Sequence, residues 1–390
     1  MTISSAALTG QVSLCDGPAL MSNGDFEAAR LTVRLGAIAD NYRMFRSLSG
    51  SAEVSGVVKA DGYGTGAIEA SKVLRDAGCK TFFVARLSEG IALRPILSDA
   101  RIFVLDGVQE QTIPAFISHR LTPVLNSLAQ IDTWCAAARA SRTVREAAIH
   151  IDTGMNRLGL PADELNVLAG DAKSRLQDID NKYWISHLAC SDDGDAAMNR
   201  DQLSRFRAAL AMLPQAAASF ASYGGVLLGK DYIFDMVRPG IGLYGGNPQV
   251  ADKPNPFKVA AQMTGTILQI LRVDSGGSVG YGATFRIGRK SVLATVALGY
   301  ADGLMRALGN RGTGAIAGHR APIAGRVSMD LVTLDVTDVP ERFLKAGAAV
   351  EFFGDTISLE EAAANAGTAN YEFLTSLGAR LPRHYVGAAQ

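Results

Sequence analysis

Residues 54–66 read VSGVVKADGYGTG, a short apolar run that ends at Lys59 and passes into a glycine-rich turn. The run has the composition of a buried strand, and seven similar runs follow at spacings that leave room for helices between them. They lie at 81–85, 102–106, 122–126, 147–152, 183–188, 218–222 and 237–244. Strands that alternate with helices form parallel βαβ units, and eight units in about 200 residues predict a (β/α)₈ barrel. A doubly wound open sheet is the alternative.

Beyond Pro254 the pattern changes to strands joined by Gly, Asp and Pro turns, which predicts an antiparallel β domain. These strands are expected at 264–273, 291–298, 314–316, 322–329, 331–336 and 349–353, with helices at 358–366 and 371–377. We therefore divide the chain into a flexible tail (1–30), a barrel (31–256) and a C-terminal β domain (257–390), with 31–36 as a strand of the β domain.

Composition excludes several classes of function. Lys plus Arg equals Asp plus Glu at 38 each, so no basic surplus indicates nucleic-acid binding. No apolar run approaches the roughly 20 residues that span a bilayer. The four cysteines are far apart and form no CxxC pair, which argues against a metal site and a disulfide framework. These features predict a cytoplasmic protein without a metal.

Lys59 is the first candidate for chemistry because barrel enzymes place their active sites at the C-terminal ends of the strands. Desolvation there lowers the pKa of a lysine and makes its amine a nucleophile for an aldehyde. A lysine at a strand end can also simply reach solvent. The glycines after Lys59 and the Tyr63 hydroxyl, a hydrogen-bond partner for phosphate, favour a ligand site.

The segment KADGYG (59–64) resembles the cofactor-lysine motif of the alanine racemase family. Six further segments match that family in the same order, and the resemblance covers residues 31–387. They are DTGMNRLG (152–159), RPGIGLYG (238–245), GYGATF (280–285), GYADG (299–303), GRVSMD (325–330) and RLPRHY (380–385).

The resemblance implies a barrel with a C-terminal β domain, pyridoxal 5′-phosphate (PLP) as cofactor, and a homodimer with shared active sites. It implies the interconversion of L-alanine and D-alanine, the latter a peptidoglycan precursor, with alanine catabolism as the other possible role. Lys59 would hold PLP as an imine and act as one acid/base group. Tyr281, reaching into the partner's barrel, would act as the other from the opposite face, as racemisation in both directions requires.

The remaining roles are also carried over from the resemblance. Arg238 would face the pyridine nitrogen and, because a guanidinium stays charged, leave that nitrogen unprotonated. His187 would stack beside the ring and link Tyr281 to Arg238. Arg157 would reach the phenolic oxygen of PLP and the substrate carboxylate, which the Met329 amide also contacts. The phosphate would be held by Tyr63, Ser222, the amides of Gly240 and Ile241, and Tyr385.

Two positions depart from the family pattern. His150 stands where many members carry a carbamylated lysine that orients the arginine, so a bound anion such as chloride is one hypothesis for the partner of Arg157. Ala221 stands where an asparagine is usual, so serine or another small amino acid remains an alternative substrate. A PLP-dependent decarboxylase and a non-catalytic PLP carrier are further alternatives, and Arg238, Tyr281 and the C-terminal domain argue against them.

Overall fold

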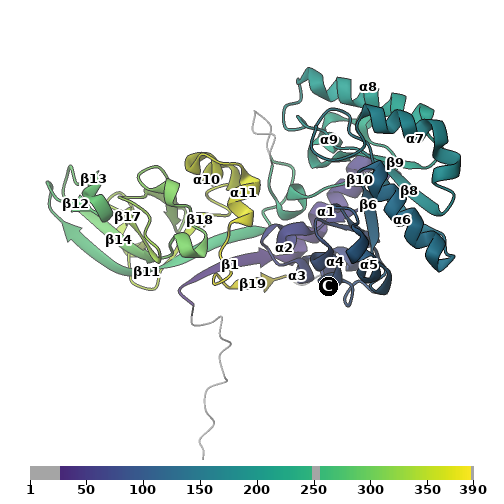
Figure 1. Cartoon of the computed structure of the whole chain (residues 1–390). Helices are drawn as coiled ribbons and strands as arrows, with labels where there is room; N and C mark the ends of the chain where they lie inside the picture. The colour runs from purple at the N-terminus through teal and green to yellow at the C-terminus, as the bar shows by residue number, and fades with distance from the viewer. Residues whose placement is uncertain (1–26, 248–254, 388–390) are drawn as a thin grey trace, which may run out of the picture.

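The computed structural model describes residues 27–247 and 255–387, so most of the predicted tail lies outside the described residues. It has two parts side by side, a barrel and a domain of mostly antiparallel strands (Figure 1). Helices α10 (Leu359–Ala366) and α11 (Asn370–Thr375) of the second part lie on the side toward the barrel (Figure 1).

The barrel is a closed parallel sheet with the strand order β2-β10-β9-β8-β7-β6-β5-β4-β3. Because β2 and β3 are halves of one strand interrupted at Ser55, the sheet closes on itself. Ser55 N–H donates to the Val237 carbonyl at 3.0 Å, and Val57 N–H donates to the Pro239 carbonyl at 3.1 Å. The bounds are β2 (Glu53–Val54), β3 (Gly56–Val57), β4 (Thr81–Val84), β5 (Arg101–Val104), β6 (Thr122–Leu125), β7 (Arg145–His150), β8 (Ile179–Ile185), β9 (Ala217–Ser222) and β10 (Met236–Arg238). The barrel prediction is confirmed.

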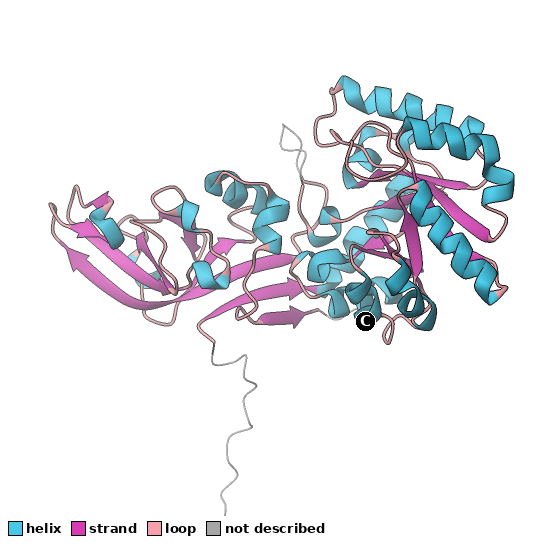
Figure 2. Cartoon of the chain, in the orientation of Figure 1, coloured by secondary structure: helices cyan, strands magenta, loops and turns pink. Residues whose placement is uncertain are grey.

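Helices follow the strands and cover the outside of the barrel (Figure 2). In the first, Ile38, Tyr42 and Phe45 recur at helical spacing and are buried against the sheet. The helices are α1 (Leu35–Ser49), α3 (Ala67–Asp76), α4 (Leu87–Leu93), α5 (Ile113–Ser118), α6 (Leu128–Ser141), α7 (Ala162–Arg175), α8 (Ala197–Met212) and α9 (Tyr223–Leu228). The segment labelled α2 (Lys59–Tyr63) is a turn without helical torsions in its interior.

The predicted strand at 237–244 is shorter in the structure. β10 ends at Arg238, and Ile241–Tyr244 forms a 3₁₀ helix. Pro239 has no N–H to continue the ladder, so the chain turns away from the sheet directly after Arg238.

The C-terminal part is built around the long strand β11 (Ala261–Val273), which pairs antiparallel with β1, β14 and β18. The other strands are β1 (Ala29–Arg34), β14 (Ser291–Ala297), β15 (Thr313–Ile316), β16 (His319–Pro322), β17 (Leu331–Asp335), β18 (Ala349–Phe353) and β19 (Arg383–Val386). β19 pairs parallel with β1. A separate hairpin of β12 (Ser278–Val279) and β13 (Phe285–Arg286) lies at the end of this domain far from the barrel (Figure 1). The expected antiparallel domain is confirmed.

The predicted strand at 322–329 is wrong. β16 ends at Pro322, and only a single bridge from Ile323 to Leu334 continues the pairing. Gly325 has a φ of 87°, and a Cβ on it would lie 2.8 Å from the Val279 carbonyl oxygen. This close approach to the hairpin requires a glycine bend, which is incompatible with an extended strand.

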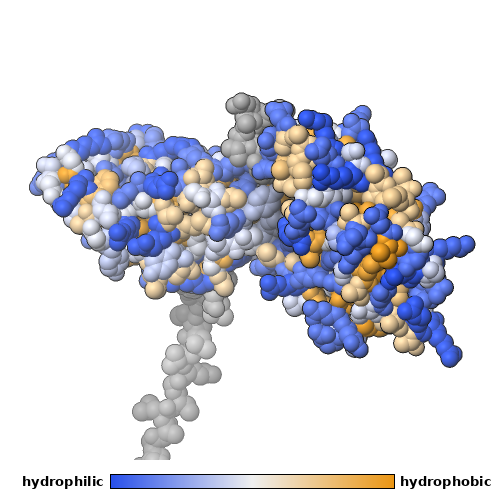
Figure 3. Space-filling model, turned by 45° about the horizontal axis from the view of Figure 1, so that its top comes forward, coloured by the Kyte–Doolittle hydropathy of each residue, from blue (hydrophilic) through white to orange (hydrophobic). Residues whose placement is uncertain are grey.

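On the face in Figure 3, hydrophilic side chains surround smaller hydrophobic groups over the barrel. Among the described residues, no helix has the length and apolar character needed to cross a bilayer.

Candidate active site

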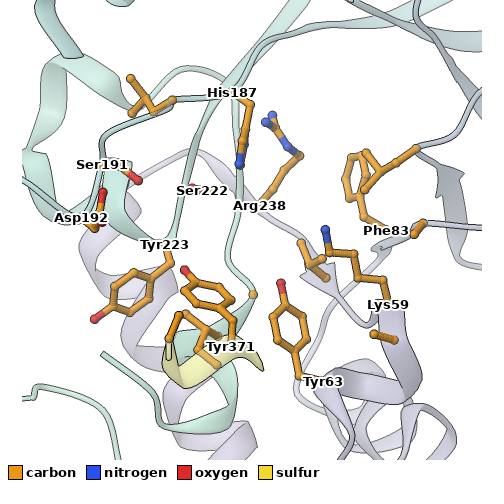
Figure 4. Close-up of a pocket in the computed structure, with 18 of the residues that line it drawn as sticks. Lys59, Tyr63, Phe83, His187, Ser191, Asp192, Ser222, Tyr223, Arg238 and Tyr371 are labelled. Atoms are coloured by element: carbon orange, nitrogen blue, oxygen red, sulfur yellow. The ribbon is translucent and has the colours of Figure 1, made fainter. Parts of the chain in front are cut away.

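The C-terminal ends of the barrel strands surround a cavity of about 840 Å³. Lys59 and Tyr63 lie on one side of it, while His187, Ser222 and Arg238 lie on the other (Figure 4). This is the end of the barrel where the fold places catalytic groups. Most residues predicted to bind the cofactor therefore meet in one place, although they come from five separate parts of the sequence.

Lys59 lies just beyond β3, separated from it by Val58, and begins a turn of unusual conformation. Ala60, Asp61, Gly62 and Tyr63 all have positive φ, at 52°, 54°, 61° and 56°. Each L residue in this left-handed conformation costs about 1–2 kcal/mol, so the turn persists only because its surroundings hold it. Its effect is to direct both Lys59 and Tyr63 into the cavity (Figure 4).

The electrostatic surroundings of Lys59 favour the neutral amine. Burial lowers its pKa, and the positive charges of Arg157 and Arg238 act in the same direction. Glu89 and Asp106 oppose this effect. A neutral amine is the form of lysine that attacks an aldehyde, so the site fits a carbonyl cofactor.

Arg238 is buried and held in place without a carboxylate partner among the described residues. One guanidinium nitrogen donates to Ser219 Oγ and another to the Ser186 carbonyl, each at 2.5 Å. Burial lowers the pKa of Arg238 to about 9, so it remains charged at neutral pH. A buried cation without a counter-ion fits a ligand that supplies a hydrogen-bond acceptor, such as an aromatic nitrogen.

His187 lies in the cavity near Arg238 (Figure 4). Burial, followed by the charges of Arg238, Arg157 and Lys59, keeps the pKa of His187 well below its ordinary value. Its imidazole is therefore neutral at physiological pH and can both donate and accept a hydrogen bond.

His150, at the end of β7, also lines the cavity and has a defined tautomer. The Asn126 amide nitrogen donates to the Leu105 and Val124 carbonyls, so its oxygen faces His150 Nδ1 at 2.8 Å. Nδ1 must then carry the proton, which leaves a lone pair on Nε2. Burial and the charge of Arg238 lower the pKa of His150 to about 4.

Arg157, the arginine that we expected the residue at position 150 to orient, is exposed and lines the same cavity. It follows the loop that Asp152 organises, since Asp152 Oδ1 accepts N–H groups of Gly154 and Met155 at 2.8 and 2.9 Å. A neutral imidazole with a free lone pair is an acceptor for a guanidinium and a poor ligand for chloride.

The part of the cavity around Tyr63, Ser222 and Gly240 has neutral hydroxyl groups, and the backbone lies close to one of them. A Cβ on Gly240 would lie 2.1 Å from the Tyr63 hydroxyl, so only glycine permits this approach. The amides of Gly240 and Ile241 begin the 3₁₀ helix, where the first N–H groups have no partner within the helix. Ser222 ends β9 at the same side of the cavity. This set fits a phosphate held by neutral donors.

Tyr385 does not line this cavity. It lies in β19, where its hydroxyl would be 1.9 Å from a Cβ on Gly66, behind the Lys59 turn. Tyr371 of α11 lines the cavity instead, with its ring 6.2 Å from that of Tyr63. The sequence offered one signal for this residue: Tyr371 is an aromatic residue at the start of the helix predicted at 371–377.

Tyr281 and Met329 also lie outside the cavity of their own chain. Tyr281 follows β12 in the distal hairpin and is 72% exposed, and Met329 is 53% exposed. A small apolar cluster beneath the hairpin holds it in place, formed by Val279, Ile287, Leu293 and Ala324. Tyr281 is thus presented to solvent by a structured element far from Lys59.

The sequence did not single out three further residues of the site. Phe83 and Asp192 line the cavity, and Glu89 accepts a hydrogen bond from the Lys59 turn. The Phe83 ring lies near Arg238, whose guanidinium carbon is 5.9 Å from the ring centre. Asp192 lines the cavity on the side of Tyr223 (Figure 4). Within the described ranges, no group of His, Cys, Asp and Glu could hold a metal ion.

Comparison with known protein families gives two matches that together span most of the chain. The alanine racemase N-terminal domain matches residues 33–248, and the alanine racemase C-terminal domain matches residues 260–385.

Individual relatives agree. The chain is 46% identical to an alanine racemase of Rhodospirillum rubrum, over 95% of this chain and 99% of the relative. It is 45% identical to a catabolic alanine racemase of Agrobacterium fabrum, over 92% of both chains, and 43% identical to a biosynthetic one from that organism, over 93% and 95%. Among solved structures, alanine racemase from Bartonella henselae with covalently bound pyridoxal phosphate is similar, with a TM-score of 0.88 and 38% identity over 92% of this chain and 99% of that one.

Proposed function

The chain belongs to the alanine racemase family, and from this premise we propose that it interconverts L-alanine and D-alanine with PLP as its cofactor. The observation that carries this proposal is the meeting of two groups in one cavity. One is a lysine amine with a lowered pKa, and the other is a buried arginine without a carboxylate partner among the described residues.

PLP supplies an aldehyde that bonds to amines and an aromatic ring that stabilises negative charge at the substrate α-carbon. Lys59 is the residue that would bond to the aldehyde. Arg238 would donate to the pyridine nitrogen, and His187 would lie beside the ring. Tyr63, Ser222, Gly240, Ile241 and, in place of Tyr385, Tyr371 would hold the phosphate.

An arginine at the pyridine nitrogen, here Arg238, would favour racemisation over the other reactions that the cofactor supports. A carboxylate at this position would favour a protonated ring and a strong electron sink. A guanidinium donates a hydrogen bond but keeps its own proton. Arg238 would thereby limit the charge that the ring takes from the α-carbon, which favours return of a proton to that carbon. This arrangement argues against the decarboxylase alternative.

Racemisation requires an acid/base group on each face of the α-carbon. Lys59 provides one group from within the barrel. For the other we propose Tyr281, which its own chain exposes on the distal hairpin and leaves outside the cavity. A homodimer in which each hairpin enters the partner's barrel would complete the site, with Met329 contacting the substrate carboxylate there.

Arg157 would bind the substrate carboxylate and the phenolic oxygen. We propose that His150 Nε2 accepts a hydrogen bond from Arg157 and takes the place of the carbamylated lysine. The lone pair that Asn126 leaves on Nε2 supports this assignment over a chloride ion. Met155, Leu158 and Leu188 narrow the same cavity with apolar side chains, which favours a methyl group over a polar substituent.

We further propose a cytoplasmic location, because Cys79 and Cys135 are buried free thiols. D-alanine made there would be available as a peptidoglycan precursor. Sequence identity does not distinguish this biosynthetic role from alanine catabolism, since a catabolic and a biosynthetic relative are 45% and 43% identical to the chain.

The reaction is tested by proton–deuterium exchange. The purified protein with PLP is incubated in D₂O with L-alanine, L-serine or other amino acids, and NMR follows the Hα signal while chiral analysis follows the D-isomer. We expect loss of Hα and formation of D-alanine foremost, and neither in Lys59→Ala. Faster conversion of another amino acid would change the substrate, and absence of Hα exchange with every amino acid would contradict the proposal.

A further inference from the structure

Glu89 connects the Lys59 turn to a neighbouring helix through the two oxygens of one carboxylate. Oε2 accepts the N–H groups of Ala85 and Arg86 at 2.8 and 3.0 Å. This is the usual capping of a helix by an acidic residue at its third position, here in α4. Oε1 instead leaves the helix and accepts the N–H of Ala60 at 2.6 Å.

The bond to Ala60 acts on Lys59 itself. The N–H of Ala60 and the carbonyl of Lys59 belong to the same planar peptide group, so fixing one fixes the backbone torsion ψ of Lys59. That torsion sets how the turn leaves the Lys59 Cα, and therefore where the turn lies relative to the Lys59 side chain. Ala60 is also the first of the four consecutive residues with positive φ.

Backbone hydrogen bonds span the turn, from the Gly62 N–H to the Val58 carbonyl at 3.0 Å and from the Gly64 N–H to the Ala60 carbonyl at 2.8 Å. The other side-chain contacts restrain its far end. Asp61 Oδ1 accepts the N–H of Ala67 at 2.8 Å, and Arg383 donates to the Gly64 carbonyl at 3.0 and 3.1 Å. Among the side-chain contacts of the described residues, Glu89 makes the one that restrains the start of the turn at Ala60. Its carboxylate also places a negative charge close enough to act on the Lys59 amine.

We propose that Glu89 is a positioning residue that holds the Lys59 turn in its left-handed conformation and thereby aims the Lys59 amine into the cofactor cavity. The proposal rests on the proposed function for the identity of the cofactor. The restraint on the turn is a property of the chain alone. Glu89 touches neither substrate nor cofactor and acts through Lys59.

Glu89→Asp separates this role from simple helix capping. Aspartate keeps the charge and can cap α4, but its side chain is one methylene shorter and cannot also reach Ala60. Glu89→Gln keeps the length but offers one acceptor oxygen for three N–H groups. Glu69→Asp is the matched control, because Glu69 lies on the adjacent helix α3 and its carboxylate pairs with Lys72 at 2.7 Å.

Two measurements on the PLP-loaded full-length variants decide the proposal: hydrogen–deuterium exchange by mass spectrometry, and kcat and KM for L-alanine. In Glu89→Asp we expect exchange in residues 59–66 to rise about tenfold or more, as loss of a charged hydrogen bond implies. Exchange in α4 should stay unchanged, and kcat should fall by a similar factor with little change in KM. Glu69→Asp should match the unmodified protein.

Unchanged exchange in residues 59–66 together with unchanged kcat in Glu89→Asp would overturn the proposal and leave Glu89 as a helix cap. If that variant does not fold, the same two measurements on Glu89→Gln decide. An unmodified protein that fails to racemise any amino acid would overturn the proposed function, while the exchange data would still decide the role of Glu89.

Discussion

At the scale of single residues, the histidines of the cavity make the protein sensitive to acid. The pKa of His150 is about 4 in the folded chain, against about 6.5 for an unfolded histidine. Below pH 6.5 the unfolded chain binds a proton that the folded chain does not. The neutral His150 therefore contributes stability that is present above about pH 6.5 and is lost as the pH falls through about 4.

We expect His150→Gln to remove this contribution, because glutamine does not titrate and its amide can still donate to Asn126. Urea unfolding of the variant should lose less stability between pH 6.5 and 4 than that of the unmodified protein, by on the order of 2 kcal/mol. His384→Gln, at an exposed site, is the control. An identical pH dependence for His150→Gln and the unmodified protein would show that His150 takes up a proton in the folded state.

Single residues also mark how far the sequence could predict the site. Lys59 and Arg238 are recognisable from their motifs and His187 from its place after a strand, because strand ends converge in this fold. Tyr385 and Tyr371 could not be ranked in this way. Which tyrosine faces the cavity depends on how α11 packs against the Lys59 turn, a contact between segments more than 300 residues apart.

At the scale of elements, the left-handed turn is a local departure from ordinary backbone preference. Ala60 sits in it at a φ of 52°. Glycine adopts this conformation without the steric cost that alanine has, so Ala60→Gly should raise the free energy of unfolding by about 1 kcal/mol.

An alanine-to-glycine change in an ordinary helix should have the opposite effect on the free energy of unfolding. Ala136 is an exposed residue within α6, where glycine should lower the free energy of unfolding by about 1 kcal/mol. Thermal or urea unfolding of the two variants measures both changes in the free energy of unfolding. Destabilisation of similar size in both would mean that the turn at Ala60 is not left-handed in solution.

The elements themselves were predictable to different degrees. The apolar runs that became β4 to β9 are bounded by turn residues and buried on both faces, so composition alone located them. The runs at 237–244 and 322–329 are equally apolar but do not form strands throughout. Pro239 removes an N–H from the ladder, which is a local effect that the strand prediction overlooked. Gly325 bends the chain against Val279 of the hairpin, a contact between segments distant in the sequence.

At the scale of the whole molecule, one chain brings together the proposed cofactor site but only one of the two proposed acid/base groups. Lys59 lines the cavity, while Tyr281 is exposed on the hairpin at the opposite end of the β domain (Figure 1). The family resemblance implied that Tyr281 reaches into the partner's barrel, and the structure places the two residues far apart within one chain. Under our proposal, a second copy of the chain supplies the missing group, and the isolated chain is inactive.

Subunit complementation tests this central claim most directly. Lys59→Ala and Tyr281→Phe should each be unable to racemise alanine as homodimers. Unfolded together and refolded as a mixture, they should form heterodimers in which one site carries both Lys59 and Tyr281 intact. Because such heterodimers make up about half of a random mixture and have one intact site of two, about a quarter of the unmodified activity should return. A mixture that contains heterodimers, as shown by mass spectrometry, yet remains as inactive as its parents would contradict the shared two-group site.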